Sequence, residues 1–266
     1  IIDGQGGEDT IWLDYTTPVV VDLGAGISSV IAAGAENRLI NLENIVGGAG
    51  DDTLIGDTGN NLICGREGND ILSGGLGDDI YLFINAWGND IINELANSGR
   101  DQISLAGYSP LGLSAATEDA VFIIGIEGIT VSAGVNNILY NGNSLEDLTG
   151  GSGNDRFIFD DQAILTGRID GYTGSDELNY SRYTTSREVI LTELGKLDGF
   201  AGQEEAVADG FSNIDTIIAG QSDSDSFTGM NADAVFTINE IDNSYQVNAN
   251  MLGFTGFEYV KGGNAN

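Results

Sequence analysis

Acidic and amide side chains recur at one fixed position in a run of nine-residue repeats. Residues 47–82 read GGAGDDTLI, GDTGNNLIC, GREGNDILS and GGLGDDIYL without a gap. The sixth position of these four repeats holds Asp52, Asn61, Asp70 and Asp79. Carboxylate and carbonyl oxygens are the ligands that calcium takes, about six to eight at a time and in flexible geometry. The spacing therefore predicts calcium chemistry at position 6.

Each repeat supplies a turn and a short strand that would place these side chains. Glycine occupies positions 1 and 4, where it allows positive φ and close approach of two backbones. The apolar residues at positions 7–9 have strand character, with the large residue of position 8 pointing inward. We expect a solenoid with two repeats per coil, so that residues 18 apart stack. Because like charges in contact are unfavourable, the stacked acids call for cations between them. One row of ions is expected near Asp52, Asp70 and Asp90, and a second near Asn61 and Asp79.

The tandem run resembles the RTX (repeats-in-toxin) nonapeptide GGxGxDxUx, which forms a calcium-binding parallel β-helix. A fifth, degenerate copy contains Asp90. The resemblance implies that the position-6 residues bind several Ca²⁺ ions, with Asn61 the weaker ligand. It also suggests carbonyl ligands from the glycine-rich turns, at Gly47, Gly48, Gly50, Gly65, Gly68, Gly74 and Gly77.

Single copies of the repeat are scattered outside the run. They lie at residues 4–12, 150–158, 171–179 and 220–228, with a weaker copy, SGRDQI, at residues 98–103. Their candidate metal ligands are Asp9, Asp155, Asp176, Asp225 and Asp101. Since an ion site needs a stacked neighbour, each of these copies is either a calcium site or a plain turn.

A larger internal duplication indicates a modular chain. Residues 2–56 and 169–229 share an ordered series of landmarks, including Tyr15-Thr16-Thr17 with Tyr183-Thr184-Thr185 and Asn44-Ile45 with Asn213-Ile214. The second copy carries a polar insertion at about residues 195–209. We expect an all-β, elongated, calcium-bound β-roll or β-solenoid with interspersed strand segments. The best helix candidate, residues 203–211, is short.

Five segments are expected along the chain. They are a first duplicated unit (1–46), the tandem β-roll (47–92), a β-rich linking segment (93–149), the second duplicated unit (150–229) and a C-terminal β segment leading into a further repeat (230–266).

Composition excludes several classes of function. The chain has 266 residues, 41 of them acidic and 9 basic, which gives a net charge of −32. This charge argues against nucleic acids and anionic membranes as partners, and no apolar run is long enough to insert into a membrane. There is no histidine and a single cysteine, so catalytic machinery built on histidine, internal disulfides and cysteine-rich zinc sites are absent. No catalytic sequence motif is present, and we expect a protein that is not an enzyme.

The function that fits best is a calcium-stabilised structural or adhesive module of a secreted bacterial surface, surface-layer, fibre or matrix protein. It would fold on binding calcium outside the cell, after export of the type I kind that the resemblance implies. Two alternatives stay open: the β-roll module of an RTX-type secreted enzyme acting on polysaccharide, lipid or protein, and a carbohydrate-binding adhesin domain. The two ends of the chain are in repeat register. The chain is therefore either one unit of a tandem array, with further copies joined end to end as partners, or a piece cut from inside a solenoid. Calcium and cell-surface polysaccharide are the other expected partners.

Overall fold

The computed structural model describes residues 1–29, 38–94, 99–142, 144–239 and 242–263. Of the partial repeat expected at the C-terminus, residues 264–266 lie outside this range. The chain divides into two compact units. Unit 1 comprises Ile1–Ala116 with Gly128–Glu146, and unit 2 comprises Thr117–Glu127 with Asp147–Asn266. The five segments expected from the sequence stay a prediction.

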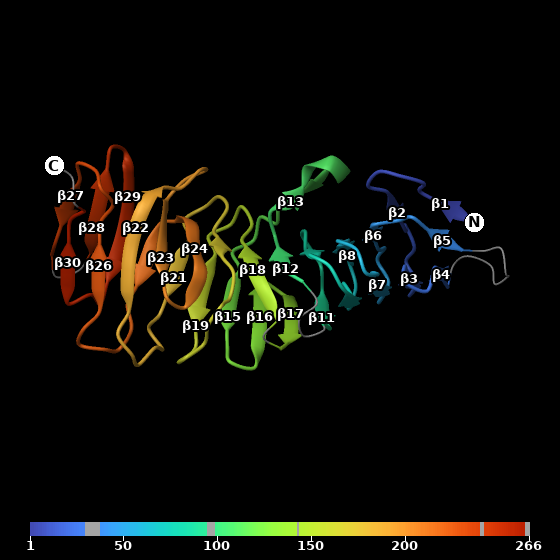
Figure 1. Ribbon diagram of the computed structural model, residues 1–266, viewed down its shortest axis with the longest axis horizontal. Helices are drawn as coiled ribbons and strands as arrows, with labels where there is room; N and C mark the ends of the chain where they lie inside the picture. The colour runs from blue at the N-terminus through green and yellow to red at the C-terminus, as the bar shows by residue number, and fades with distance from the viewer. Residues whose placement is uncertain (30–37, 95–98, 143, 240–241, 264–266) are drawn as a thin grey trace. The chain divides into compact units, whose positions relative to one another are not determined.

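Unit 1 consists of two parallel-rich sheets that take up strands alternately along the chain (Figure 1). One sheet has the order β2-β6-β8-β10-β12, and the other has the order β4-β3-β7-β9-β11-β17-β16. The strands of the two sheets are β2 (Thr10–Trp12), β3 (Val20–Asp22), β4 (Ile27–Ser28), β6 (Asn44–Val46), β7 (Thr53–Ile55), β8 (Leu62–Cys64), β9 (Ile71–Ser73), β10 (Ile80–Leu82), β11 (Asn89–Ile92), β12 (Asp101–Ser104), β16 (Gly128–Ala133) and β17 (Asn136–Asn141). Two small pairs complete it: β1 (Ile2–Asp3) with β5 (Leu39–Ile40), and β13 (Gly107–Tyr108) with β14 (Leu113–Ser114).

The register of the sheets shows that two repeats make one coil. Thr53 lies beside Ile71, and Leu62 lies beside both Asn44 and Ile80, each time 18 residues away along the chain. The residues at position 8, Leu54, Ile63, Leu72 and Tyr81, are fully buried between the two sheets. The predictions of a coil of two repeats and of an inward-facing position 8 are therefore confirmed.

One outer sheet face in unit 1 is covered by the chain itself. Val46, Cys64 and Leu82 form a buried apolar cluster with Leu113, which belongs to the excursion of β13, the 3₁₀ turn η1 (Ser109–Leu111) and β14. Burial raises the pKa of the Cys64 thiol to about 12, with nearby Arg66 acting in the opposite direction. The single cysteine is therefore a packing residue that stays protonated at neutral pH.

Unit 2 also has two sheets, but antiparallel hairpins interrupt its coils. The sheet orders are β18-β20-β24-β23-β22-β26-β30 and β15-β19-β21-β25-β29-β28-β27. The strands are β15 (Val121–Ile124), β18 (Leu145–Thr149, which begins just before the unit boundary), β19 (Arg156–Phe159), β20 (Ile169–Asp170), β21 (Glu177–Asn179), β22 (Glu188–Leu194), β23 (Phe200–Glu204), β24 (Val207–Ile214), β25 (Thr216–Ile218), β26 (Ser226–Thr228), β27 (Val235–Thr237), β28 (Asn243–Val247), β29 (Asn250–Thr255) and β30 (Tyr259–Lys261).

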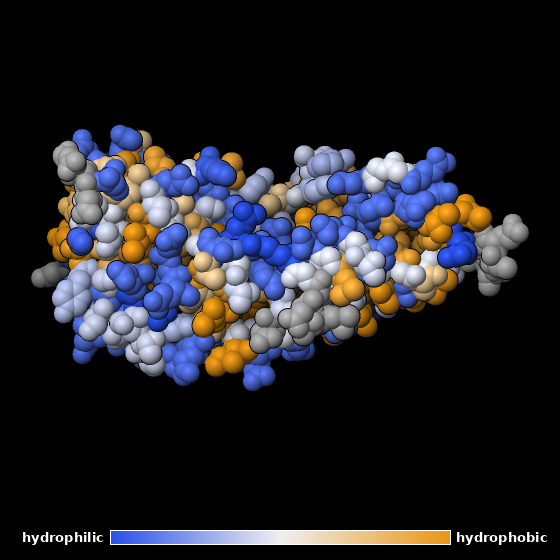
Figure 2. Space-filling view, in the orientation of Figure 1, coloured by the Kyte–Doolittle hydropathy of each residue, from blue (hydrophilic) through white to orange (hydrophobic). Residues whose placement is uncertain are grey.

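The structure confirms an all-β, β-roll type of fold, with no α-helix in the parts of the chain that it describes. The helix candidate at 203–211 is wrong, because these residues form the end of β23, a two-residue turn and the start of β24, and the two strands pair antiparallel. Val207 and Phe211 are buried in the sheet, and this tertiary packing outweighs the local helix preference of the sequence. Hydrophilic residues cover much of the face drawn in Figure 2, in keeping with the composition.

Candidate metal centres in the turns

A row of carboxylates runs along one edge of the coils in unit 1. Asp70 Oδ1 accepts the backbone N–H of Asp52 at 2.7 Å, and Asp90 Oδ1 accepts the N–H of Asp70 at 2.7 Å. At the start of this row, Asp52 Oδ1 accepts the N–H of Val19 at 2.9 Å. Each acid is thus hydrogen-bonded to the coil before it. The structure brings Asp52, Asp70 and Asp90 together in one row, as the sequence predicts.

A second row follows the opposite turns. Asp79 Oδ1 accepts the N–H of Asn61 at 2.7 Å, and Asp101 Oδ1 accepts the N–H of Asp79 at 2.9 Å. Asn61, the one amide at position 6, receives the N–H of Asp57 on its own Oδ1 at 2.8 Å. Asp101, predicted only from a weak copy of the repeat, therefore extends the row of Asn61 and Asp79.

In three members of the rows, the second carboxylate oxygen is buried and has no hydrogen-bond donor. This holds for Oδ2 of Asp70, Asp79 and Asp90, whose residues are at most 2% exposed. An ionised carboxylate in such a place is strongly destabilised unless a cation or a donor compensates it. These orphaned oxygens are the local observation that fits bound calcium.

The glycines at position 1 let oxygen atoms approach the backbone closely. A Cβ atom built on Gly65 would lie 2.0 Å from Asp70 Oδ2, and one on Gly74 would lie 2.0 Å from Asp79 Oδ2. At Gly47 the same position is 2.7 Å from Asp52 Oδ2 and 2.6 Å from the Gly65 carbonyl oxygen of the next coil. A carboxylate oxygen and a carbonyl oxygen therefore both lie beside this glycine, and oxygens of these two kinds are the donors that calcium prefers.

The raised pKa values of the row carboxylates also fit a cation bound between them. Burial, followed by the charges of neighbouring acids, raises the pKa of Asp70 and of Asp79 to about 7 and that of Asp90 to about 8. Hydrogen bonds from the backbone N–H groups oppose these shifts but do not offset them. A divalent ion between the carboxylates would remove the cause of the shift by compensating the charge.

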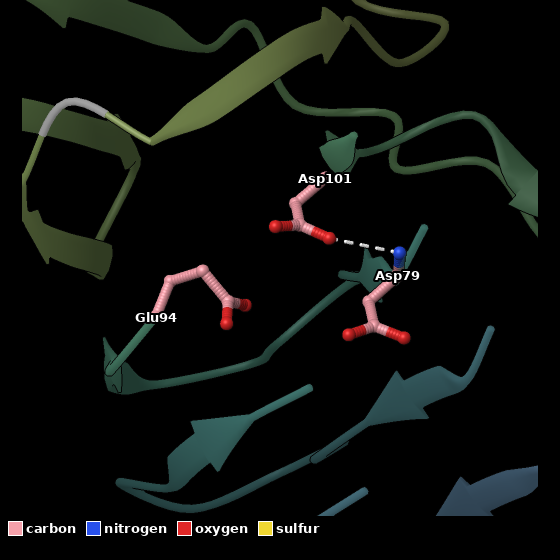
Figure 3. Close-up of side chains that lie close together, drawn as sticks. All are labelled: Asp79, Glu94 and Asp101. Atoms are coloured by element: carbon pink, nitrogen blue, oxygen red, sulfur yellow. Dashed lines mark hydrogen bonds between the residues drawn. The ribbon is translucent and has the colours of Figure 1, made fainter. Parts of the chain in front are cut away.

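A third carboxylate joins the second row from outside the repeat register. Glu94, which follows β11, presents its carboxylate to Asp79 and Asp101, and one oxygen of each of the three lies within 4.8 Å of the others. Figure 3 shows the three groups around a common space. The hydroxyl of Tyr81 donates to Glu94 Oε2 and orients it. Calcium–oxygen distances of about 2.3–2.6 Å allow one ion to contact all three.

Position 5 of the repeats forms a separate ladder on the exposed side of the turns. Asp51 Oδ1 accepts the N–H of Asn69 at 2.9 Å, and Asn69 Oδ1 accepts the N–H of Asn89 at 3.1 Å. Asn137 continues it by donating from its side-chain amide to Asn89 Oδ1 at 2.9 Å. This ladder connects successive coils by hydrogen bonds on the exposed side of the turns.

Unit 2 contains a comparable row, built from the isolated copies. Asp155 Oδ1 accepts the N–H of Ala120 at 2.7 Å, and Asp176 Oδ1 accepts the N–H of Asp155 at 2.8 Å. Asp215 Oδ2 then accepts the N–H of Asp176 at 3.0 Å. Burial raises the pKa of Asp155 to about 6 and that of Asp176 to about 8. The isolated copies thus have stacked neighbours, although these lie 21–39 residues away.

Asp9 and Asp225 lie in equivalent turns of the two duplicated segments, next to glutamates. Asp9 donates its N–H to Glu43 Oε2 at 2.8 Å, and Asp225 donates its N–H to Glu258 Oε2 at 2.8 Å. Asp101 makes the same contact with Glu146 Oε2 at 2.8 Å. In each case a glutamate takes the place of the next aspartate in the row.

The internal duplication is visible in these contacts. Val19, four residues after Tyr15, donates to Asp52, and Arg187, four residues after Tyr183, donates to Asp225 Oδ1 at 2.6 Å. The predicted equivalence of Asn44 with Asn213 is off by three residues. Asn44 pairs with Thr10, which follows Asp9, and Thr216 pairs with Glu177, which follows Asp176. Asn44 therefore corresponds to Thr216.

Several row members were missed by the sequence reasoning. They are Glu43, Glu94, Glu146, Asp198, Asp215 and Glu258. Five of them precede a large apolar residue two positions on, as position 6 precedes position 8: Glu43 with Ile45, Glu146 with Leu148, Asp198 with Phe200, Asp215 with Ile217 and Glu258 with Val260. The glycines of repeat positions 1 and 4 are absent before Glu43, Glu146 and Asp198. Asp215 keeps the first as Gly210, and Glu258 keeps both as Gly253 and Gly256. Glu94 precedes only the small Ala96.

The comparison with protein families agrees with the geometry. The family of the RTX calcium-binding nonapeptide repeat matches residues 46–81, in four copies. No curated protein matches the chain. Residues 46–81 are therefore RTX repeats, and this part of the chain is a calcium-binding β-roll. In the described part of the chain, no helix has the length and apolar character needed to span a membrane.

Proposed function

We propose that the chain is a non-catalytic structural or adhesive module of a secreted bacterial surface, surface-layer, fibre or matrix protein, which calcium folds and stiffens outside the cell. The observation that carries the proposal is the set of buried carboxylate oxygens without donors at Asp70, Asp79 and Asp90. Without ions these rows repel, and the charge of −32 favours an expanded chain that can be exported. At the roughly millimolar calcium outside cells, ion binding drives folding.

Calcium-dependent folding tests the first half of the proposal. Far-UV circular dichroism and the hydrodynamic radius are measured on the full chain in chelator and then in calcium, with magnesium as the control ion. We expect loss of β signal and expansion in chelator, both reversed by calcium and not by magnesium. An unchanged spectrum and radius after complete removal of calcium would contradict it.

The non-catalytic role is tested by activity screens on the calcium-loaded chain. Hydrolase and lyase assays on polysaccharides, and lipase and protease assays, are expected to give no turnover. Turnover that the calcium-loaded chain sustains would favour the alternative, an RTX-type enzyme.

A carbohydrate-binding adhesin domain is the second candidate function. Trp12 and Tyr15 each keep 45% of their surface exposed, and the Arg66 guanidinium lies 5.7 Å from the Trp12 ring centre. An exposed aromatic face beside a cation is able to stack on a sugar ring. Binding on a glycan array that requires calcium and is lost in Trp12→Ala would establish this role; no binding would leave the structural role.

A further inference from the structure

The polar insertion of the second duplicated segment forms a hairpin whose turn reaches the carboxylate row of unit 2. Strands β22 and β23 pair antiparallel, and the turn between them, residues 195–199, is closed by the N–H of Gly195 donating to the carbonyl of Gly199 at 3.0 Å. Asp198 lies in this turn, outside every copy of the repeat. The turn therefore brings an additional acid to a row that the repeats alone do not complete.

Two hydrogen bonds hold the turn against the row. Asp198 Oδ2 accepts the N–H of Gly174 at 3.1 Å, and the N–H of Leu197 donates to Asn213 Oδ1 at 3.0 Å. One carboxylate oxygen from each of Asp176, Asp198 and Asp215 lies within 4.8 Å of the other two. The three acids come from three separate stretches of the chain, so their convergence is a property of the folded unit.

Two oxygens in this cluster lack donors although they are buried. Asp176 is fully buried, and its Oδ2 has no hydrogen-bond partner; Asp198 Oδ1 is likewise buried and without a partner. A Cβ atom built on Gly171 would lie 2.5 Å from Asp176 Oδ2 and 2.1 Å from the Asn213 carbonyl oxygen. Glycine at position 171 thus lets the unpartnered carboxylate oxygen of Asp176 and the carbonyl oxygen of Asn213 approach the backbone closely.

No cationic side chain in the described part of unit 2 compensates the charges of these three acids. No lysine or arginine among the described residues forms an ion pair with any of the three acids. Burial raises the pKa of Asp176, Asp198 and Asp215, and the charges within the cluster add to the shift of Asp176 and Asp215. Three carboxylates and a nearby carbonyl, without sulfur or imidazole, form a donor set for a hard divalent cation of calcium's size.

We infer that Asp176, Asp198 and Asp215 bind a calcium ion that fastens the β22–β23 turn to the turn row of unit 2. This site lies outside residues 46–81, where the RTX repeat matches, and its third ligand comes from an insertion rather than from a repeat. The inference extends the proposed function, because calcium here orders a hairpin in addition to the coils.

The experiment compares calcium binding and hydrogen exchange in the full chain and in Asp198→Asn. The asparagine keeps an acceptor for the Gly174 N–H but removes one charge, so the fold is retained. Equilibrium dialysis is expected to show one calcium ion fewer, or one site weakened by about tenfold or more. Calcium is expected to slow exchange in residues 195–199 and 171–176 of the full chain, and in the variant to lose this effect at 195–199.

Matched variants separate this site from general charge effects. Glu193→Gln removes an exposed carboxylate on the same hairpin and is expected to bind calcium as the unmodified chain does. Asp215→Asn, which keeps an acceptor for the Asp176 N–H, is expected to reproduce the loss seen in Asp198→Asn. Should Asp198→Asn fail to fold, Asp215→Asn supplies the same test.

The outcomes distinguish this inference from the proposed function. Equal calcium stoichiometry, affinity and exchange in Asp198→Asn and the unmodified chain would overturn the inference, while calcium protection of residues 47–92 would leave the proposed function standing. Absence of calcium protection in both regions would overturn both. Loss of calcium protection confined to 195–199 in Asp198→Asn would support the inference.

Discussion

The tandem coils of unit 1 and the interrupted coils of unit 2 build the same carboxylate row from different sequence spacings. In unit 1 the stacked acids are 18 and 20 residues apart, at Asp52, Asp70 and Asp90. In unit 2 the intervals are 21 and 39 residues, at Asp155, Asp176 and Asp215. The constant feature is the bond from the backbone N–H of one acid to the side chain of the next. Parallel register, and not a fixed repeat length, therefore maintains the row.

The two regions differ more in their cores than in their turns. In the tandem coils of unit 1 the inward residues are mainly aliphatic, such as Leu54, Ile63 and Leu72. In unit 2 aromatic rings stack from coil to coil, with Phe122 and Phe157 at 4.5 Å and Phe227 and Phe254 at 4.7 Å between ring centres. Larger buried side chains contribute more to folding, about 150–250 Å² of buried surface for each aromatic residue. We therefore expect the tandem coils to depend more on ions for their stability.

Removal of calcium should separate the two regions most strongly. In chelator, residues 47–92 are expected to lose hydrogen-exchange protection by orders of magnitude, whereas the aromatic coils at 121–124, 156–159 and 177–179 retain part of theirs. Hydrogen exchange with mass spectrometry measures both regions in one sample. Equal loss in the two regions would show that core composition does not govern the dependence on calcium.

The pH dependence of stability should reverse between the calcium-free and the calcium-loaded chain. The folded-state pKa values of Asp70, Asp79, Asp90 and Asp176, at about 7 to 8, lie above the ordinary value of 3.8. Raised values mean that protonation favours the folded state, so this contribution is complete below about pH 3.8 and is lost as pH rises through about 8. In chelator the urea midpoint is expected to be higher at about pH 5 than at about pH 8. In calcium the order is expected to invert, because protons compete with the ion.

Single ligands should differ according to their place in a row. Asp70 is bonded to Asp52 on one side and Asp90 on the other, whereas the backbone N–H of Asp9 is bonded to one stacked acid, Glu43. Asp70→Ala is expected to weaken calcium binding by about tenfold or more and to lower the melting temperature in calcium, and Asp9→Ala is expected to do less. Calorimetric titration of the two variants side by side checks this. Equal losses would refute the stacking as the basis of affinity.

Glycine at position 4 should matter where coils are in backbone contact. Gly68 has φ +136°, and a Cβ there would lie 2.4 Å from the Gly50 carbonyl oxygen of the preceding coil. Gly68→Ala is expected to destabilise the chain in calcium by about 1–2 kcal/mol or more. Gly6→Ala is the control, because no atom lies within 4 Å of the position that its Cβ would take. Urea unfolding of both variants measures the difference, and similar midpoints would contradict the close packing.

The sequence was most informative where the repeat is regular. The coil of two repeats, the inward position 8 and the membership of Asp52, Asp70 and Asp79 in two rows could all be predicted from spacing, because each coil contacts only its neighbours. Asp101 and Asp176 were predicted as candidates without known partners. Their partners, Glu146 and Asp215, are 45 and 39 residues away, a separation that no local pattern encodes.

Composition and period determined the class of chemistry and the local coil: acids at a constant position, glycines that admit tight turns, and apolar residues that form three-residue strands. Tertiary structure decided which acids outside the repeats complete the clusters. Glu94 reaches Asp79 and Asp101, and Asp198 reaches Asp176 and Asp215, through chain paths of different length and shape. The physical reason is that a repeat fixes only contacts between adjacent coils, whereas the end point of a hairpin or a connecting segment depends on how the whole unit packs.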